Sequence, residues 1–417
     1  MKNLNYRVQA LTQRPTLAQL CALGAQYDPF YMGEMPNGDC YVAYGQIADF
    51  KPQQGDLTTL TQWQQQLKQQ FQQPEIEVVG AGGFQTTDQR ASVWGPLTTG
   101  YFFVPQFLVH LTATQAIYQG PADQQAWFEQ QLAQQVALPA QRLQAVQTHA
   151  LAAQHWQQGV TATVARLQQH QQQKVVLARV LAVTAGQAWQ PVQVWQTLRQ
   201  QQPQTYHFLL RYQDRTFISA TPERLVARQG DQVTTAAIAG TIRRGVTPEQ
   251  DQTLGAQLLN DAKNRQEQAY VVQAITQALR QLGLTVHYDQ QPQLLKNPQV
   301  QHLWTPITGN GVVTLGALLA SLHPTPALGG LPKVAALQQI RQVEPQQRGL
   351  FGAPIGHFNL AGDGEFAVGI RSGLLQGQQA WLFAGAGIVV GSQAPQEFQE
   401  TALKFQPMLQ ALKGDAK

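Results

Sequence analysis

The sequence has few charged residues. Asp, Glu, Lys and Arg make up only 12% of its 417 residues, which is half the ~25% typical of soluble domains. Glutamine takes their place, because the chain contains 74 Gln against 11 Glu. With 43% hydrophobic residues, the chain can still build a large core. Since carboxylates are scarce, each glutamate is a candidate for a specific role.

Other absences exclude whole classes of protein. The two cysteines, Cys21 and Cys40, cannot form a disulfide framework for a chain of this length, and no CxxC or Cys/His spacing indicates zinc. No run of about 18 consecutive apolar residues occurs, and the first residues contain no apolar segment typical of a signal peptide. We therefore expect a cytoplasmic protein without membrane partners.

The positive charge is modest and scattered. A net charge of +4 and a pI near 9.0 are compatible with nucleic acid or with a small anionic ligand. Lys and Arg occur singly or in short pairs such as Arg243 and Arg244, without a basic run interleaved with aromatic residues. The sequence therefore predicts no nucleic-acid binding, and a small anionic substrate stays compatible with the charge. Separately, we expect the protein to be a monomer.

The hydrophobic pattern changes along the chain. Residues 1–115 alternate strand-like pieces with Pro/Gly turns, and residues 122–173 show the three- and four-residue apolar steps of helices with Gln-rich outer faces. Beyond residue 173 come short apolar strands and helical stretches. Further expected helices cover residues 60–71, 250–282, 334–343 and 395–412; expected strands cover 40–44, 77–80, 101–105, 107–109, 174–179, 206–210, 216–219, 365–371 and 380–384. Hairpin-like strands with separate helices predict an α+β protein with large antiparallel sheets.

The last expected helix carries Glu397, Glu400 and Lys404 on one face. Such a face is typical of an exposed, salt-bridged helix surface. The glycine-rich segment 384–391 before it favours a site, because glycines let backbone N–H groups approach an anion next to carboxylates that can hold a hard cation. Both interpretations stay open. The GxGxxxG spacing differs from the dinucleotide fingerprint, so no nucleotide cofactor is predicted.

Three further charged residues occur at the ends of expected elements. Lys174 opens an apolar strand, either as an edge residue or as an amine that acts as a base. Glu223 directly follows a strand, as a turn residue or an acid. Glu267 lies four residues after Lys263, which alone predicts a surface ion pair.

Taken together, these stretches resemble the chorismate-utilising enzymes, and most closely the isochorismate synthases. The matches, among them TPERL and LHPTPALGG, occur in family order over roughly residues 165 to 412, at residues 174–179, 221–225, 238–241, 263–267, 322–330, 344–345, 348–351, 364–366, 370–371, 384–389 and 397–404. Eleven matches in order are far more specific than one motif. The N-terminal third matches only loosely.

The resemblance implies an α+β fold of two large packed antiparallel β-sheets with outer helices. Residues 1–165 would form a variable, strand-rich part with helices of the same unit, and residues 166–417 the chorismate-binding catalytic core. It also implies the reaction: water adds at ring carbon 2 of chorismate while the hydroxyl at carbon 4 leaves, giving isochorismate, an isomerase reaction that feeds menaquinone synthesis.

Residue roles are implied one position at a time. Lys174 corresponds to the general base and Glu223 to the general acid. Glu267 and Glu400 correspond to Mg²⁺ ligands, and Glu397 lies in the same acidic cluster. The residues corresponding to the substrate-binding groups are Gly240, Thr241, His323, Ala327, Arg371, Gly385 and Lys404. For His323 a place in the core is an equal alternative, and Gln268 stands where the family often has His.

Alternatives to this activity stay open. Ammonia-using relatives typically lack the lysine found at position 174, whereas salicylate synthases share it. Ala327, Leu328 and Phe351 resemble the synthases that stop at isochorismate. A siderophore pathway is an alternative to menaquinone synthesis. From a different class, a non-catalytic carboxylate-binding protein would explain the acids as surface pairs.

Overall fold

The computed structural model describes residues 5–84, 90, 92–139, 143–169, 172–296 and 300–414. Antiparallel pairs join the 20 strands of these residues into one continuous sheet, which folds into two halves, the first and the second sheet, that share a long two-stranded ribbon. The first sheet runs, neighbour by neighbour, through β8 (Lys174–Ala185), β20 (Gln379–Ile388), β19 (Ser372–Gln376), β10 (Arg215–Thr221), β9 (Tyr206–Tyr212), β2 (Phe30–Glu34), β3 (Cys40–Phe50) and β5 (Gly100–Leu111). Its edges carry β7 (Val146–Ala150) and β16 (Gly330–Leu331) on β8, and β6 (Ala116–Pro121) and β1 (Tyr6–Ala10) beyond β5.

The second sheet begins at the other end of β5. From there it runs through β4 (Glu77–Gly82), β17 (Pro354–Asn359), β18 (Gly364–Val368), β11 (Arg224–Gln229), β12 (Gln232–Arg243) and β15 (Val300–Asn310), with β13 (Thr285–Tyr288) and β14 (Gln293–Lys296) on the far edge. A bulge between Gln46 and Ala48 of β3 follows Gly45, whose φ is +58°. Because a bulge bends a strand, the β3–β5 ribbon can leave one sheet and enter the other.

One apolar core lies between the two sheets. Each sheet also has a second core on its other face, between its strands and the helices that cover it. Phe208, Phe217 and Phe383 of the first sheet meet Val79 and Ile355 of the second in the inner core. The helices over the second sheet and its junction with β8 are α2 (Leu60–Phe71), α4 (Ala153–Gln168), α7 (Ala262–Gln281), α8 (Leu315–Leu322) and α9 (Lys333–Val343). Those over the first sheet are α1 (Leu17–Gly24), α3 (Gln125–Ala133), α5 (Pro191–Gln201) and α10 (Ala394–Lys413).

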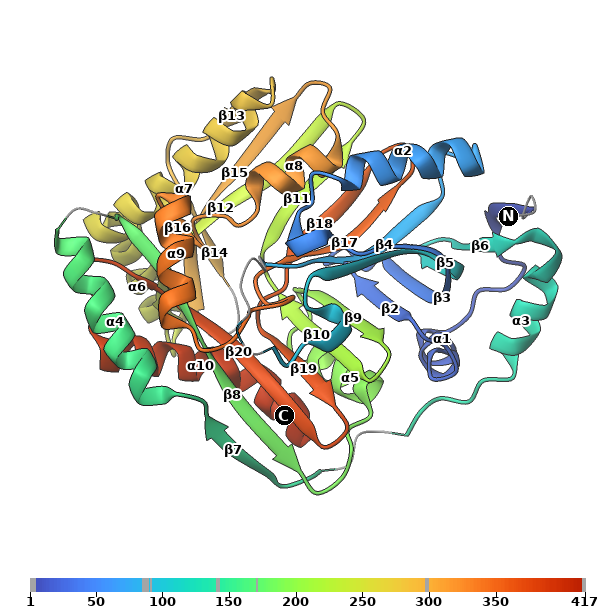
Figure 1. The fold of residues 1–417 in the computed structure, drawn as a ribbon, viewed down its shortest axis with the longest axis horizontal. Helices are drawn as coiled ribbons and strands as arrows, with labels where there is room; N and C mark the ends of the chain where they lie inside the picture. Colours follow the sequence, from blue (N-terminus) through green and yellow to red (C-terminus); the bar gives the residue numbers. More distant parts are fainter. Residues whose placement is uncertain are drawn as a thin grey trace.

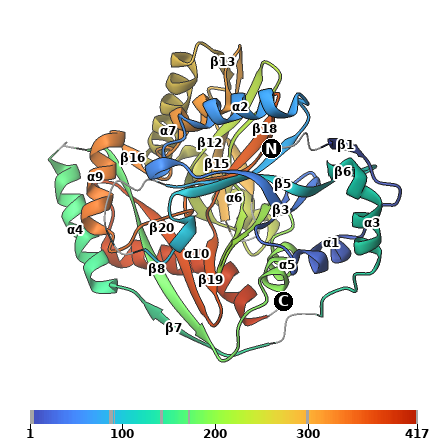
Figure 2. The ribbon, with the colours of Figure 1, turned by 45° about the vertical axis from the view of Figure 1, so that its right-hand side comes forward.

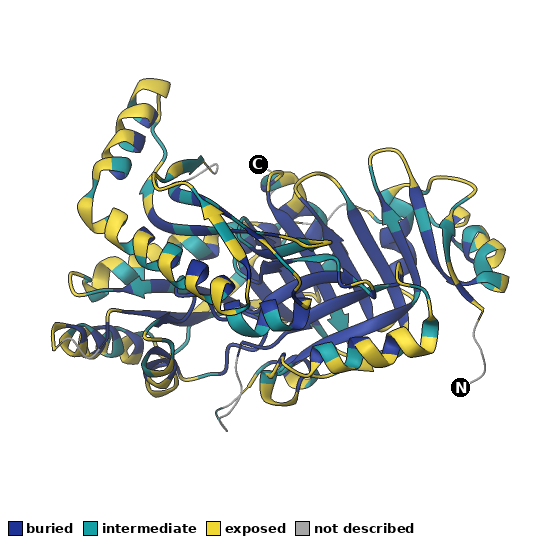
Figure 3. Cartoon of the chain, turned by 90° about the horizontal axis from the view of Figure 1, so that it is seen from above, coloured by how far each residue is buried: buried dark blue, intermediate teal, exposed yellow. Residues whose placement is uncertain are grey.

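The figures show this layered arrangement. In Figure 1, α2 and α8 cross the strands of the second sheet, and α10 and α5 cover the first. The turned view keeps α4 and α9 beside β8, at the same end of the molecule (Figure 2). Buried strands lie between helices whose outward faces are exposed and Gln-rich (Figure 3). The expected α+β fold with antiparallel sheets and outer helices is confirmed.

Residues 1–165 and 166–417 share both sheets. The pair β2–β9 joins the two parts in the first sheet, and the pair β4–β17 joins them in the second. A third pair, β7–β8, also joins residues of the two parts, so the expected division crosses three strand pairs.

Three of the differences between the expected and the observed elements have a clear physical cause. The stretch 250–282 is two helices, α6 (Pro248–Asn260) and α7, because Asp261 has extended backbone and its side chain caps α7. The stretch 122–173, expected to be helical, also contains β7, an edge strand whose exposed residues give no strand alternation. The strand expected over 365–371 ends at Val368, because the chain turns there and Arg371 has a φ of +50°.

Candidate active site

A cavity of about 420 Å³ opens between the ends of β8, β12 and β20 and the helices α7 and α10. Every predicted site residue except His323 lines this cavity: Lys174, Glu223, Gly240, Thr241, Glu267, Ala327, Arg371, Gly385, Glu397, Glu400 and Lys404. These residues come from strands and helices that are far apart in the sequence. The fold therefore brings together most of the residues that the resemblance selects.

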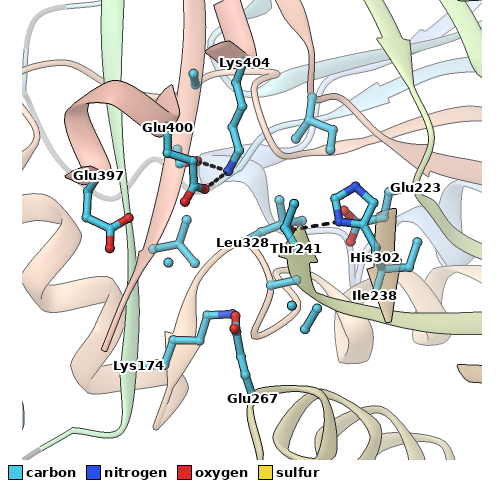
Figure 4. Close-up of a pocket in the computed structure, with 18 of the residues that line it drawn as sticks. Lys174, Glu223, Ile238, Thr241, Glu267, His302, Leu328, Glu397, Glu400 and Lys404 are labelled. Carbon is cyan, nitrogen blue, oxygen red and sulfur yellow. Dashed lines mark hydrogen bonds and ion pairs between the residues drawn. The ribbon is translucent and has the colours of Figure 1, made fainter. Parts of the chain in front are cut away.

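Lys174 and Glu267 point toward each other across the cavity (Figure 4). The Lys174 Nζ donates to Glu267 Oε1 over 2.6 Å, and the lysine side chain is only 4% exposed. A Cβ at Gly387 of the neighbouring strand would lie 3.0 Å from Lys174 Cε, so glycine there leaves room for the lysine. The partner of Glu267 is therefore Lys174, rather than the Lys263 suggested by sequence spacing.

Glu223 is a partly buried residue whose backbone is held by two hydrogen bonds. Its N–H donates to Thr221 Oγ1 over 3.2 Å, and its C=O accepts from Val368 over 2.9 Å. Burial raises the pKa of Glu223 to about 7, although the charges of Lys174, Lys404 and Arg371 oppose the shift. Near neutral pH this side chain can therefore hold a proton and release it, as a general acid must.

The two glutamates of α10 are in different electrostatic states. Glu400 accepts from Lys404 Nζ over 2.6 Å, and the same ammonium donates to Gly385 O over 2.8 Å. Burial alone would raise the pKa of Glu400, but the Lys404 ammonium and other cations hold it below its ordinary value. Burial raises the pKa of Glu397, which lies a turn away (Figure 4). The two carboxyl groups therefore differ in acidity, because the pKa of Glu400 is lowered and the pKa of Glu397 is raised.

Arg371 is fixed in an uncommon backbone conformation. Its φ is +50°, in the left-handed region. The Ser219 hydroxyl donates to Ile370 O over 2.7 Å, and the Ala220 N–H donates to Arg371 O over 3.3 Å. β10 therefore stabilises the turn from which the guanidinium reaches the cavity.

His302 lines the cavity and was not identified from the sequence. It lies opposite Thr241 in the β12–β15 pair, and its Nδ1 is hydrogen-bonded to Thr241 Oγ1 over 2.9 Å. Burial, with the charges of Arg371 and Lys404, lowers the pKa of His302 to about 4, so the ring is neutral at pH 7. Only the strand register could have placed this lone histidine at the site.

His323 lies in the core instead of the cavity wall. It follows α8, its Nε2 lies 3.1 Å from Phe84 O, and its ring packs edge-on against Phe84. Burial lowers the pKa of His323 to about 3, so it is a neutral core residue. The predicted cleft position for His323 therefore differs from the observed one.

The carboxylates of the cavity can hold a small cation. Glu267 approaches from α7, and Glu397 and Glu400 approach from α10. Within the part of the chain that the structure describes, no three acidic, His or Cys side chains form a preformed metal cluster. Mg²⁺ keeps several waters and needs only one or two carboxylates, so these donors fit such an ion without a preformed cage.

Comparisons with known proteins agree with this fold. A family model described as chorismate binding enzyme matches residues 4–413. The chain belongs to the chorismate-binding enzyme family.

Several of its relatives are isochorismate synthases. The chain is 38% identical over 350 residues to the isochorismate synthase MenF of Bacillus subtilis, covering 81% of this chain and 74% of that protein. It is 41% identical over 259 residues to the salicylate biosynthesis isochorismate synthase of Pseudomonas aeruginosa, covering 62% and 54%. The solved structure of MenF, the menaquinone-specific isochorismate synthase from Escherichia coli, matches with a TM-score of 0.85 at 26% identity, covering 98% and 94%. The resemblance inferred from the sequence motifs is confirmed.

Among the described residues, no helix is long and apolar enough to span a membrane.

Proposed function

We propose that this chain is an isochorismate synthase, an isomerase that converts chorismate to isochorismate for menaquinone synthesis. The observation that carries the proposal is the joint position of Lys174 and Glu223 in one cavity with the cations Arg371 and Lys404. The relatives in Bacillus subtilis and Escherichia coli, both named as isochorismate synthases, support the same activity and pathway.

In the proposed reaction Lys174 and Glu223 move the two protons. The Lys174 amine takes a proton from the water that adds at ring carbon 2. Glu223 gives its proton to the hydroxyl that leaves carbon 4, while the double bond shifts. A carboxyl whose pKa lies near 7 suits this step, because it is protonated often enough to donate and acidic enough to release the proton.

The cations of the cavity bind the two carboxylates of chorismate. Arg371 offers a bidentate fork and Lys404 a point charge, and the backbone N–H groups near Gly240, Thr241 and Gly385 add donors. Ala327 lies against the substrate in this proposal. Glu267 and Glu400, with Glu397 beside them, would hold Mg²⁺, which when bound supplies positive charge between these carboxylates and the dianionic substrate.

The decisive experiment is product analysis of the purified protein with chorismate and MgCl₂, with an EDTA-treated sample as the control. Isochorismate should accumulate only when the metal is present. Salicylate with pyruvate would instead assign a salicylate synthase, and no consumption of chorismate would overturn the proposal. A monomeric protein in the cytoplasm stays a prediction of the sequence.

A further inference from the structure

Arg179 is a buried cation directly behind the active site. It lies on β8, five residues after Lys174, and is 4% exposed. Burial lowers the pKa of Arg179 to about 10, and no acidic group among the described residues offsets that shift. An arginine buried without a carboxylate is costly, and an apolar side chain of similar volume would avoid the cost. Its presence therefore calls for a specific role.

Among the described residues, the Arg179 guanidinium forms its hydrogen bonds and aromatic contacts with α10. Its Nε donates to Thr401 Oγ1 over 2.6 Å, and its terminal nitrogen donates to Phe398 O over 3.0 Å. The guanidinium carbon lies 3.8 Å from the ring centroid of Phe398 and 4.8 Å from that of Phe405. The planar group therefore holds two aromatic rings and two hydrogen-bond acceptors of one helix at once.

These contacts define one strip of α10, and the site residues form the adjacent strip. Phe398, Thr401 and Phe405 recur at steps of three and four, so they share a face of the helix. Glu397, Glu400 and Lys404 each precede one of them by a single residue, which places the cavity strip about 100° around the helix. Fixing the first strip therefore fixes where the second strip points.

We propose that Arg179 is a positioning residue that sets the rotation and axial position of α10, and thereby holds Glu400 and Lys404 at the cavity. β8 carries both Lys174 and Arg179, so the same strand fixes the amine and the carboxylate-bearing helix relative to each other. Directional hydrogen bonds resist sliding of the helix, which apolar packing alone would allow. The inference rests on the proposed function, because it concerns residues assigned there to metal and substrate.

The test compares Arg179→Met with wild type by two measurements. The first is the MgCl₂ concentration that gives half of the metal-induced rise in melting temperature, a readout independent of turnover. The second is the chorismate KM and kcat at saturating MgCl₂. We expect the half-saturating MgCl₂ concentration to rise about tenfold or more, since residues that orient metal ligands typically act on this scale. The chorismate KM should rise together with the half-saturating MgCl₂ concentration. The fold-decrease in kcat should be smaller than the fold-increase in either of these two quantities.

Arg211→Met is the matched control. Arg211 is a partly buried arginine of β9 that donates to the carbonyls of Gly24 and Tyr27 and lies 5.4 Å from the Phe30 ring, away from the cavity. Its replacement should lower the melting temperature without changing the MgCl₂ concentration at half-saturation. If Arg179→Met behaves like Arg211→Met, then Arg179 only stabilises the fold and the inference is wrong.

Two gentler variants keep the test decisive if Arg179→Met does not fold. Arg179→Lys keeps the charge without the fork, and Thr401→Val removes one hydrogen bond. Both should raise the half-saturating MgCl₂ concentration by less than Arg179→Met, and unchanged values in both would refute the inference. A wild-type protein that forms no isochorismate would instead refute the proposed function, so the two failures can be distinguished.

Discussion

Charged side chains at two places around the cavity differ in their partners. Beside β8, where it also lines the cavity, Arg348 donates to both oxygens of Glu344, and the two residues are 3% and 4% exposed. Deeper in the site, Glu223 is partly buried near three cations without an ion pair among the described residues, and Lys174 pairs with Glu267 alone. A buried charged group whose hydrogen bonds are all satisfied stabilises the fold, whereas a charged group with few partners can exchange a proton or a ligand.

The Glu344–Arg348 pair takes the place of a missing strand beside β8. On that edge β16 pairs only with Lys174 and Val175, and β7 pairs from Leu181 onward. In the gap between them, Glu344 accepts from Ala178 N over 2.7 Å, and Arg348 donates to Val176 O over 2.7 Å. Because buried backbone groups need partners, this pair completes the strand that carries Lys174.

Removing the Lys174 amine should give the largest effect on activity. Lys174→Ala is expected to lower kcat by about 10²- to 10⁴-fold, the range typical of a lost general base. The melting temperature should change little, because Glu267 can reach water once its partner is gone. Lys333→Ala is the control, since Lys333 is a partly buried lysine outside the cavity that donates to His323 O. Steady-state kinetics with full activity in Lys174→Ala would contradict the assigned base.

Breaking the saturated pair should act on stability instead. Glu344→Gln leaves the buried Arg348 without a counter-ion, and we expect it to lower the free energy of unfolding by ~3–5 kcal/mol. The double variant Glu344→Leu with Arg348→Met should recover only part of the loss, because Ala178 N and Val176 O would remain unpaired. Urea unfolding measures both. A loss below about 1 kcal/mol in Glu344→Gln would show that the pair has no such role.

Local sequence patterns predict some of the helices well, miss α1, α5 and α8, and predict the contacts of the site poorly. Apolar periodicity predicts α2 over its full length, and α9 and α10 to within one residue at each end. It does not predict β7, because an exposed edge strand lacks alternation. The sequence spacing pairs Glu267 with Lys263, whereas the structure pairs Glu267 with Lys174, 93 residues away. Likewise His302 reaches the cavity only through the register of β12 and β15.

Resemblance to a family predicts contacts between residues that are distant in sequence, which local patterns cannot predict. The reason is that a matching motif also implies a position in the family's three-dimensional fold. Glu223 illustrates this: its own neighbours suggest only a turn residue. Its burial and its proximity to Lys174 and Arg371 depend on residues distant in sequence. His323 shows the limit of the transfer, since membership of a matching motif does not determine which way a side chain points.

The raised pKa of Glu223 predicts two pH dependences. As an acid, Glu223 should lose its proton above pH of about 7, so kcat should fall there. In the unfolded chain it ionises near its ordinary value of 4.5, whereas the folded chain keeps the proton up to about 7. Between these values the folded state binds more protons, so stability should decrease as pH rises, by roughly 3 kcal/mol in total, and then stay level.

Glu223→Gln separates the two dependences. The variant should be nearly inactive, and its free energy of unfolding should lack the decrease between pH 4.5 and 7 that the wild type shows. Urea unfolding at several pH values makes the comparison. Parallel pH profiles in the two proteins would mean that Glu223 titrates normally when folded.

The smallest effect is expected at Gln268, next to the proposed metal ligand Glu267 but facing away from the cavity. Its Nε2 donates to Ala237 O and to Thr305 Oγ1, each over 3.0 Å, so it ties α7 to the second sheet by neutral hydrogen bonds. Gln268→Leu should therefore cost ~1–3 kcal/mol of stability, with the MgCl₂ response unchanged. Gln268→His should keep more of the stability, because an imidazole can still donate one hydrogen bond there. A shifted MgCl₂ response in either variant would mean that α7, like α10, depends on a buried polar anchor to place its carboxylate.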